Sequence, residues 1–163
     1  MNKFVVQPLK GLEWNGRLLP FGASRDEAMA LLGTAEVVRG SYYYFNSELR
    51  IDFDADGKAE FMEFLGGPDG MLRPELYGAN VFESDAEELS ALLKAKNGGE
   101  IIDAENGYSY AFPAISVGVY RESTPADIAD MEGMVPAEEF EFEKRRAFRW
   151  ATLGFGRAGY YTP

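Results

Sequence analysis

The residues that come closest to a chemical motif lie at 52–63, where the chain reads DFDADGKAEFME. Three aspartates, a glycine and a closing glutamate match the spacing of a calcium-binding EF-hand loop. Such a loop needs a helix on each side to hold its carboxylates around the ion. Here both flanks alternate between apolar and polar residues, as strands do, and the Asp-Gly pair at 56–57 favours a hairpin turn. We therefore expect a β-hairpin without a metal site, in which Asp52, Asp54 and Asp56 could at most bind calcium weakly.

Two further motifs have plain structural explanations. The pattern G-x-G-x-x-G at 154–159 binds dinucleotides only when it leads from a strand into a helix. Only four residues follow it, so we interpret these glycines as kinks in a terminal strand. The basic run KRR at 144–146 could bind phosphate or an acidic partner. It follows four glutamates, however, and we expect a charge-balanced helix end.

The chain contains neither histidine nor cysteine. The usual general base near neutral pH is therefore missing, as are thiolate nucleophiles, disulfides and the commonest metal ligands. Carboxylates are abundant, but no spacing singles out a catalytic pair. We expect a protein that is not an enzyme and that needs neither a cofactor nor a metal.

The formal net charge of −11 is the strongest indication of a partner class. This charge repels nucleic-acid phosphates and anionic membrane surfaces, and it attracts a basic protein. It also simply favours solubility. The N-terminal residues lack the apolar run of a secretory signal, and no stretch is long enough to span a bilayer. We expect a cytoplasmic protein with a basic protein partner, and no nucleic-acid or membrane binding.

Tyrosines gather at 42–44, 108–110 and 160–161, and could hold such a partner. Exposed Tyr and Trp side chains are favoured interface anchors because they bury a large area with few rotatable bonds. The same residues could equally belong to the core. The interface hypothesis names Tyr42, Tyr44, Tyr108, Tyr110, Trp150, Tyr160 and Tyr161.

Periodicity and capping signals predict the elements that position these residues. Ser24 and Glu27 form one capping box before an apolar stripe, and Ser84 and Glu87 form a second. Residues 11–22 read as a loop around an Asn-Gly turn at 15–16. The predicted elements are a strand at 3–7, a helix at 25–32, strands at 41–45, 48–53 and 58–65, a helix after Ser84, strands at 108–112 and 114–120, a helical turn at 125–130, a helix at 136–149 and a strand at 150–161.

These elements indicate an internal repeat of a helix followed by strands. The first capping box matches the second at a constant offset, and Leu49, Ile51 and Phe53 match Ile115, Val117 and Val119. We expect one domain over 1–163, with one repeat at about 11–66, another at about 79–121, and a C-terminal helix and strand at about 136–163. Each repeat alone has too little core, so the two should pack together.

The first repeat also carries a family resemblance. FGASRDEAMALLG at 21–33, an aromatic strand at 42–45 and FDADGK at 53–58 resemble the modules of the β-lactamase inhibitor protein and of small outer-membrane assembly lipoproteins. The chain is also similar to uncharacterised bacterial proteins with a second half of the form NVFE…LL…GYSY-x-FP, here residues 80–113. The resemblance as a whole covers roughly residues 11–120. The resemblance implies a sheet face that holds another protein. The chain has neither the cysteine that lipoproteins attach to lipid nor the disulfides of the inhibitor, so those features do not carry over.

We therefore predict an α+β fold in which two helix-plus-strands repeats form a mostly antiparallel sheet with helices on one face. The predicted function is a non-catalytic protein-binding module, for instance an acidic immunity-type protein that neutralises a basic bacterial toxin. The alternative is a small-ligand-binding or sensor domain, which a closed pocket lined by tyrosines would favour. The predicted core comprises Met29, Leu32, Leu49, Ile51, Phe53, Leu89, Leu92, Ile115, Val117 and Val119.

Overall fold

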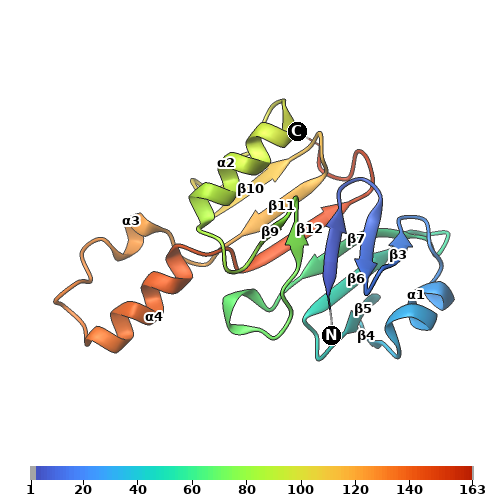
Figure 1. The fold of residues 1–163 in the computed structure, drawn as a ribbon, viewed down its shortest axis with the longest axis horizontal. Helices are drawn as coiled ribbons and strands as arrows, with labels where there is room; N and C mark the ends of the chain where they lie inside the picture. Colours follow the sequence, from blue (N-terminus) through green and yellow to red (C-terminus); the bar gives the residue numbers. More distant parts are fainter. Residues whose placement is uncertain (1–2, 163) are drawn as a thin grey trace.

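A seven-stranded antiparallel sheet, here called the large sheet, runs through the computed structural model, which describes residues 3–162 (Figure 1). Its strand order is β10-β11-β12-β7-β6-β5-β4. The predicted α+β class and the mostly antiparallel sheet are confirmed. The strands are β4 (Glu36–Val38), β5 (Ser41–Tyr44), β6 (Leu49–Phe53), β7 (Ala59–Phe64), β10 (Ser109–Phe112), β11 (Val117–Tyr120) and β12 (Thr152–Gly156).

A smaller sheet has the order β3-β2-β1-β8-β9, in which only the β1–β8 pair is parallel. Residues 11–20 form a hairpin here, so the loop predicted over 11–22 is wrong. The Asn15-Gly16 turn was the usable signal, because both residues have the positive φ that a tight hairpin needs. The strands are β1 (Phe4–Gln7), β2 (Gly11–Trp14), β3 (Arg17–Pro20), β8 (Glu75–Leu76) and β9 (Ala79–Asn80).

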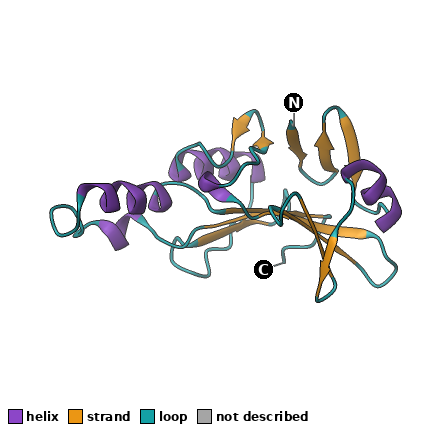
Figure 2. Cartoon of the chain, turned by 90° about the horizontal axis from the view of Figure 1, so that it is seen from below, coloured by secondary structure: helices purple, strands orange, loops and turns teal. Residues whose placement is uncertain are grey.

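The α-helices within residues 3–162 are α1 (Arg25–Leu32), α2 (Ala86–Asn97), α3 (Pro125–Ile128) and α4 (Ala137–Ala147), and a short 3-10 helix, η1, covers Gly67–Asp69. The small sheet, α1 and α2 lie on one side of the large sheet, while the C-terminal residues lie on the other (Figure 2). Among the described residues, no helix is both long and apolar enough to cross a membrane.

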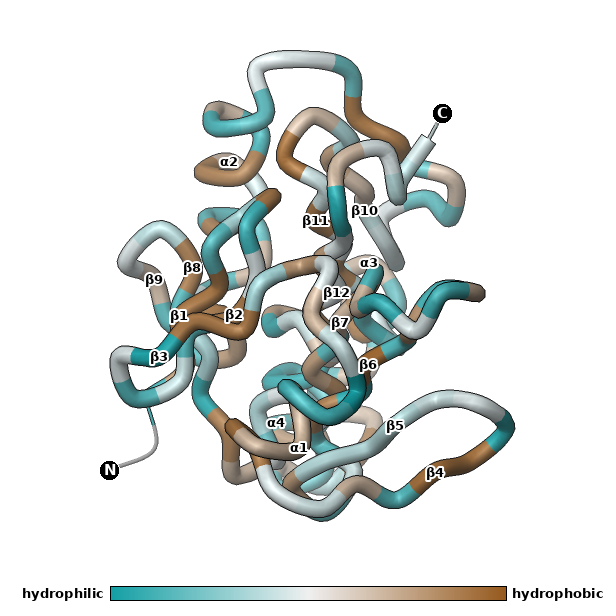
Figure 3. Tube along the Cα trace, turned by 90° about the vertical axis from the view of Figure 1, so that its right-hand side faces the viewer, coloured by the Kyte–Doolittle hydropathy of each residue, from teal (hydrophilic) through white to brown (hydrophobic). Residues whose placement is uncertain are grey.

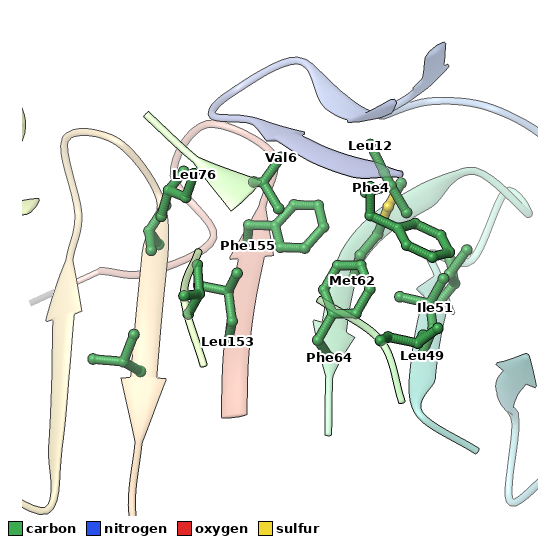
Figure 4. Close-up of a cluster of buried hydrophobic side chains, with 14 of the residues drawn as sticks. Phe4, Val6, Leu12, Leu49, Ile51, Met62, Phe64, Leu76, Leu153 and Phe155 are labelled. Carbon is green, nitrogen blue, oxygen red and sulfur yellow. The ribbon is translucent and has the colours of Figure 1, made fainter. Parts of the chain in front are cut away.

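The core fills the space between the two sheets (Figure 4). Phe4 of β1 packs edge-on against Phe64 of β7, with 5.5 Å between ring centroids, and Phe64 stacks with Phe155 of β12. Most of the predicted core is buried, with Phe53 and Leu92 partly so. The prediction that Met29 belongs to the core is wrong, since 41% of this residue is exposed. The short helix α1 turns Ala28 and Leu32, one helical turn apart, towards the core, and Met29 lies to one side.

Each half of the chain contributes a helix followed by a hairpin to the large sheet. In the β5–β6 hairpin Tyr44 pairs with Leu49, and in the β10–β11 hairpin Phe112 pairs with Val117. Leu49 therefore corresponds to Val117 and not to Ile115, which lies in the turn. The strands that flank the two hairpins differ in length, since the counterpart of β4 before β10 is a single antiparallel bridge between Ile102 and Ala111. The internal repeat, in which both halves of the chain share one structural plan, therefore stays a hypothesis.

The N-terminus of α2 is capped by Asp85 and not by the predicted Ser84. The Asp85 carboxylate accepts hydrogen bonds from the Glu87 and Glu88 amides, both at 3.1 Å. The Ser84 hydroxyl instead donates to the Asn80 carbonyl at 2.6 Å, which closes the turn after β9. Because the Ser84 side chain closes the preceding turn, the next residue, Asp85, caps the helix.

We predict that Asp85→Ala lowers the free energy of unfolding by about 1 kcal/mol, because it leaves two amides at the helix start without an acceptor. Asp85→Ser keeps an accepting oxygen and should retain most of the stability. Urea denaturation followed by circular dichroism measures both. Equal losses for the two variants would contradict this capping role.

Candidate functional site

The face of the large sheet turned away from α1 and α2, here called the far face, carries one continuous row of residues. Strand pairing places one residue from each strand side by side. Their neighbours along each strand point to the core, so the row lies on the opposite face. In order across the sheet, the row is Ala111, Gly118, Gly154, Glu63, Arg50, Tyr43 and Glu36.

The glycines of this row make room for the C-terminal tyrosines. A Cβ atom on Gly118 or Gly154 would lie 2.5–2.6 Å from the Tyr161 hydroxyl oxygen. A Cβ atom on Gly156 would lie 2.5 Å from the Cβ of Tyr160. The glycines at 154 and 156 therefore belong to a strand, as predicted, but their role is to accept aromatic rings. Tyr160 and Tyr161 fold back under β12 and cover the middle of the far face.

Beside these tyrosines lies a cluster of charged residues around Arg50. Its guanidinium lies 3.4 Å from carboxylate oxygens of both Asp52 and Glu63, and 5.4 Å from the centre of the Phe61 ring. The Ser41 hydroxyl donates to Asp52 at 2.6 Å. Burial raises the pKa of Glu63, although Arg50 acts in the opposite direction. With two carboxylates and one guanidinium, the cluster carries one uncompensated negative charge.

The calcium-loop pattern forms the β6–β7 turn. The Asp54 carboxylate accepts hydrogen bonds from the amides of Asp56 and Lys58, at 2.9 and 3.0 Å, and from Arg157 at 3.0 Å. The Lys58 amide is the main cause of the lowered pKa of Asp54. Strands flank this turn in place of the helices of an EF-hand. Across residues 3–162, no group of three or more acidic, His or Cys residues is arranged to hold a metal.

The basic run at 144–146 forms the last turn of α4, as expected. Arg146 pairs with Glu122 and, at 3.7 Å, with Glu143. Arg145 donates to the Pro68 carbonyl at 2.8 Å. These cations are tied to nearby acceptors, and they complement the negative end of the helix dipole.

The interface prediction is wrong for two residues, because both belong to the core. Tyr44 is 1% exposed and Trp150 is fully buried. Tyr44 points to the core because it shares a face with Leu49 and Phe64. The indole N–H of buried Trp150 is satisfied because it donates to the Ala86 carbonyl of α2, at 3.0 Å.

The other predicted tyrosines do not form one surface. Tyr42 and Tyr110 are half-buried on the core side, where Tyr42 packs edge-on against Phe53 and Tyr110 against Trp150. The Tyr108 hydroxyl donates to the Asp127 carboxylate of α3. Tyr160 and Tyr161 alone lie on the far face, 5.5 Å apart between ring centroids. The proposed tyrosine interface is therefore divided over three separate places.

A helical arm, residues 122–149, projects from one end of the large sheet and contains α3 and α4 (Figure 1). Residues 122–143 contain eight carboxylates and no lysine or arginine, and residues 144–149 add four basic residues, so the whole arm has a net charge of −4. Two apolar side chains stand among these carboxylates. Met134 is 80% exposed and Phe142 is 50% exposed. Sequence reasoning missed both residues, although the lack of any basic residue over this stretch was a usable signal.

Arg121 and Trp150 fix the two ends of the arm. The Arg121 side chain is only 3% exposed and lies 4.6 Å from the centre of the Trp150 ring. Arg121 donates to the carbonyls of Gly107 and Ala147, both at 3.0 Å, and to the Glu87 carboxylate of α2 at 2.9 Å. The base of the arm is thus joined to α2, to the loop before β10 and to the end of α4.

The free edge of the large sheet is a further exposed feature. In β4, Val37 and Val38 are 55% and 45% exposed, and Figure 3 shows this strand as an apolar stretch at the rim of the molecule. The strand has only three residues, and Glu36 and Arg39 stand at its ends. Short edges with flanking charges are a common protection against unwanted strand pairing.

Comparisons of this chain with models of known protein families, with curated proteins and with solved structures find no match. The resemblance to inhibitor and lipoprotein modules therefore stays a hypothesis.

We predict that Arg121→Met lowers the free energy of unfolding by about 3 kcal/mol, because buried acceptors lose their charged donor. Glu87→Gln should cost less than about 1 kcal/mol, since the Glu87 side chain is 55% exposed and solvent screens the pair. Urea denaturation measures both losses, and limited proteolysis of Arg121→Met should show cleavage in the arm. A larger loss for Glu87→Gln than for Arg121→Met would refute this ranking.

The stability of the protein at high pH should depend on the Tyr161 hydroxyl. Burial raises the pKa of Tyr161 well above that of an unfolded tyrosine, which is about 10. The stabilising effect of the neutral hydroxyl is complete below pH 10. It declines above pH 10, by on the order of 1 kcal/mol per pH unit, because the unfolded chain ionises first. Tyr161→Phe removes this dependence, so the variant should gain stability relative to the unmodified protein from pH 10 to pH 11.

The measurement is the urea midpoint of both proteins at intervals between pH 7 and pH 11. Below pH 9 the difference between the two midpoints should stay constant. Parallel curves over the whole range would show that the Tyr161 hydroxyl is in contact with water.

Proposed function

We propose that the protein is a non-catalytic binding module for a basic protein, and that the acidic arm is the surface it offers. The observation that carries this proposal is that exposed Met134 and Phe142 lie on the same projecting element as eight carboxylates. Exposed apolar side chains on such an element favour a protein partner, because burying them there requires a second surface.

The two kinds of side chain have different roles in such a complex. The carboxylates attract a basic surface and increase the rate of association. Phe142 and Met134 supply the apolar contacts that slow dissociation, as anchors at the centre of an interface do. The buried base at Arg121 holds the arm in place beforehand, which lowers the entropy lost on binding.

An acidic immunity-type protein that neutralises a basic bacterial toxin fits this proposal. The resemblance of residues 11–120 to inhibitor modules supports the same class, although it implies a sheet face as the contact. A cytoplasmic location is consistent with the absence of cysteine, since no disulfide calls for an oxidising compartment.

The remaining chemistry supports binding over catalysis. Burial raises the pKa of the Glu63 carboxyl group, and Arg50 already pairs with it. Five hollows on the described part of the chain measure about 200–330 Å³, at or near the lower end for small-molecule sites. A sensor domain with an enclosed tyrosine-lined pocket is therefore less well supported.

Photo-cross-linking tests the proposal in the native host. Benzoylphenylalanine at position 142 should capture a basic protein, which mass spectrometry identifies. The same group at position 29 is the control, because Met29 is also exposed but lies in α1. Equal capture from both positions would argue against the arm.

The captured protein is then purified and its affinity measured by calorimetry. Phe142→Ser and the double change Glu138→Gln with Glu139→Gln should each weaken binding at least tenfold, and added salt should weaken the unmodified complex. Met29→Ser should stay within twofold. A partner with an acidic surface, or one that binds the arm variants as well as the unmodified protein, would overturn the proposal.

A further inference from the structure

A narrow groove of about 200 Å³ lies on the far face beside Tyr161. Its floor is made by small side chains of β10, β11 and β12, namely Ser109, Ala111, Gly118 and Thr152. Tyr120, which is 39% exposed, and Tyr161 supply aromatic rings to its lining. The groove is too small for a drug-sized ligand and is of a size for one extended side chain.

Glu63 contributes the charge of this groove. Arg50 approaches Oε1 of Glu63 at 3.4 Å. The Arg50 cluster holds two carboxylates for one guanidinium, so one negative charge remains uncompensated next to the groove. Because the Glu63 side chain is only 19% exposed, water screens this charge less than it screens a surface carboxylate.

We propose that this groove binds one lysine or arginine side chain, whose cationic end meets the Glu63 carboxylate and whose stem lies along the tyrosine rings. A cation is attracted to the face of a tyrosine ring and to a partly buried carboxylate, so both parts of the lining favour the same ligand. The small floor residues permit the alkyl stem to lie close to the sheet.

The basic protein partner is the source of this side chain, and that part rests on the proposed function. The groove lies next to the base of the arm, since Tyr120 directly precedes Arg121 and its carbonyl accepts a hydrogen bond from the Ala151 amide at 2.7 Å. One partner could therefore contact the arm and place a basic side chain in the groove.

Titration of the whole chain with Nα-acetyl-lysine amide tests the groove without the partner. Amide signals of Gly118, Thr152 and Gly154 should shift in ¹⁵N correlation spectra, with a dissociation constant on the order of millimolar. Nα-acetyl-arginine amide should act similarly. Nα-acetyl-norleucine amide has the stem without the charge and should bind at least tenfold more weakly.

Variants separate this site from general attraction to an acidic protein. Glu63→Gln and Tyr120→Leu should each weaken binding of the lysine amide at least fivefold. Glu60→Gln, also in β7 but paired with Arg157 at 3.2 Å, should leave binding unchanged, as should Phe142→Ser in the arm. The spectra also report whether Glu63→Gln is folded, and Tyr120→Leu tests the site at an exposed residue.

The proposal is overturned when the lysine and norleucine amides bind equally. It is also overturned when Glu60→Gln weakens binding as much as Glu63→Gln, or when the shifts lie on the arm and not on β11 and β12. Lysine-amide binding in the groove together with failed capture at position 142 would reject the arm function alone. Capture at position 142 without lysine-amide binding in the groove would reject the groove alone.

Discussion

The buried guanidinium of Arg121 is the interaction on which the rest of the molecule depends. A charge this far from water is costly unless every part of it is paired. Arg121 meets this requirement through two backbone carbonyls, the Glu87 carboxylate and the ring of Trp150. These groups come from separate elements, so satisfying one side chain holds the large sheet, α2 and both ends of the arm in one arrangement.

On the far face, the contact with Tyr161 depends on glycines, because they have no side chain to block its ring. Gly118 and Gly154 pair across β11 and β12, and together they leave the space that Tyr161 fills. A glycine in a strand normally weakens it, because it has no side chain to pack. Here the ring of Tyr161 supplies that packing from the end of the chain. The far face is therefore partly closed at its centre, and the groove beside Tyr161 is what remains open.

The elements with strong local signals could be predicted from the sequence. The Ser24–Glu27 capping box fixes the start of α1, and the alternation of Leu49 and Ile51 fixes the buried face of β6. Tyr44 and Trp150 could not be assigned correctly, because a tyrosine or tryptophan has similar local signals in a core and at an interface. Their burial depends on Phe64 and Ala86, which are distant in sequence. Arg121 was missed for the same reason, since its acceptors come from residues between 87 and 147.

The distribution of charge in the arm supports the proposed binding role. Eight carboxylates within 22 residues repel one another, and Arg146, which follows that stretch, pairs with two of them, Glu122 and Glu143. A helix shaped by stability alone would place acids in its first turn and bases in its last, as α4 does with Glu138, Glu139 and Lys144. Asp130, Glu132 and the exposed Met134 lie in the turns between α3 and α4, where a helix dipole does not account for them. Under the proposed function, a basic partner that covers these residues removes both the repulsion and the apolar exposure.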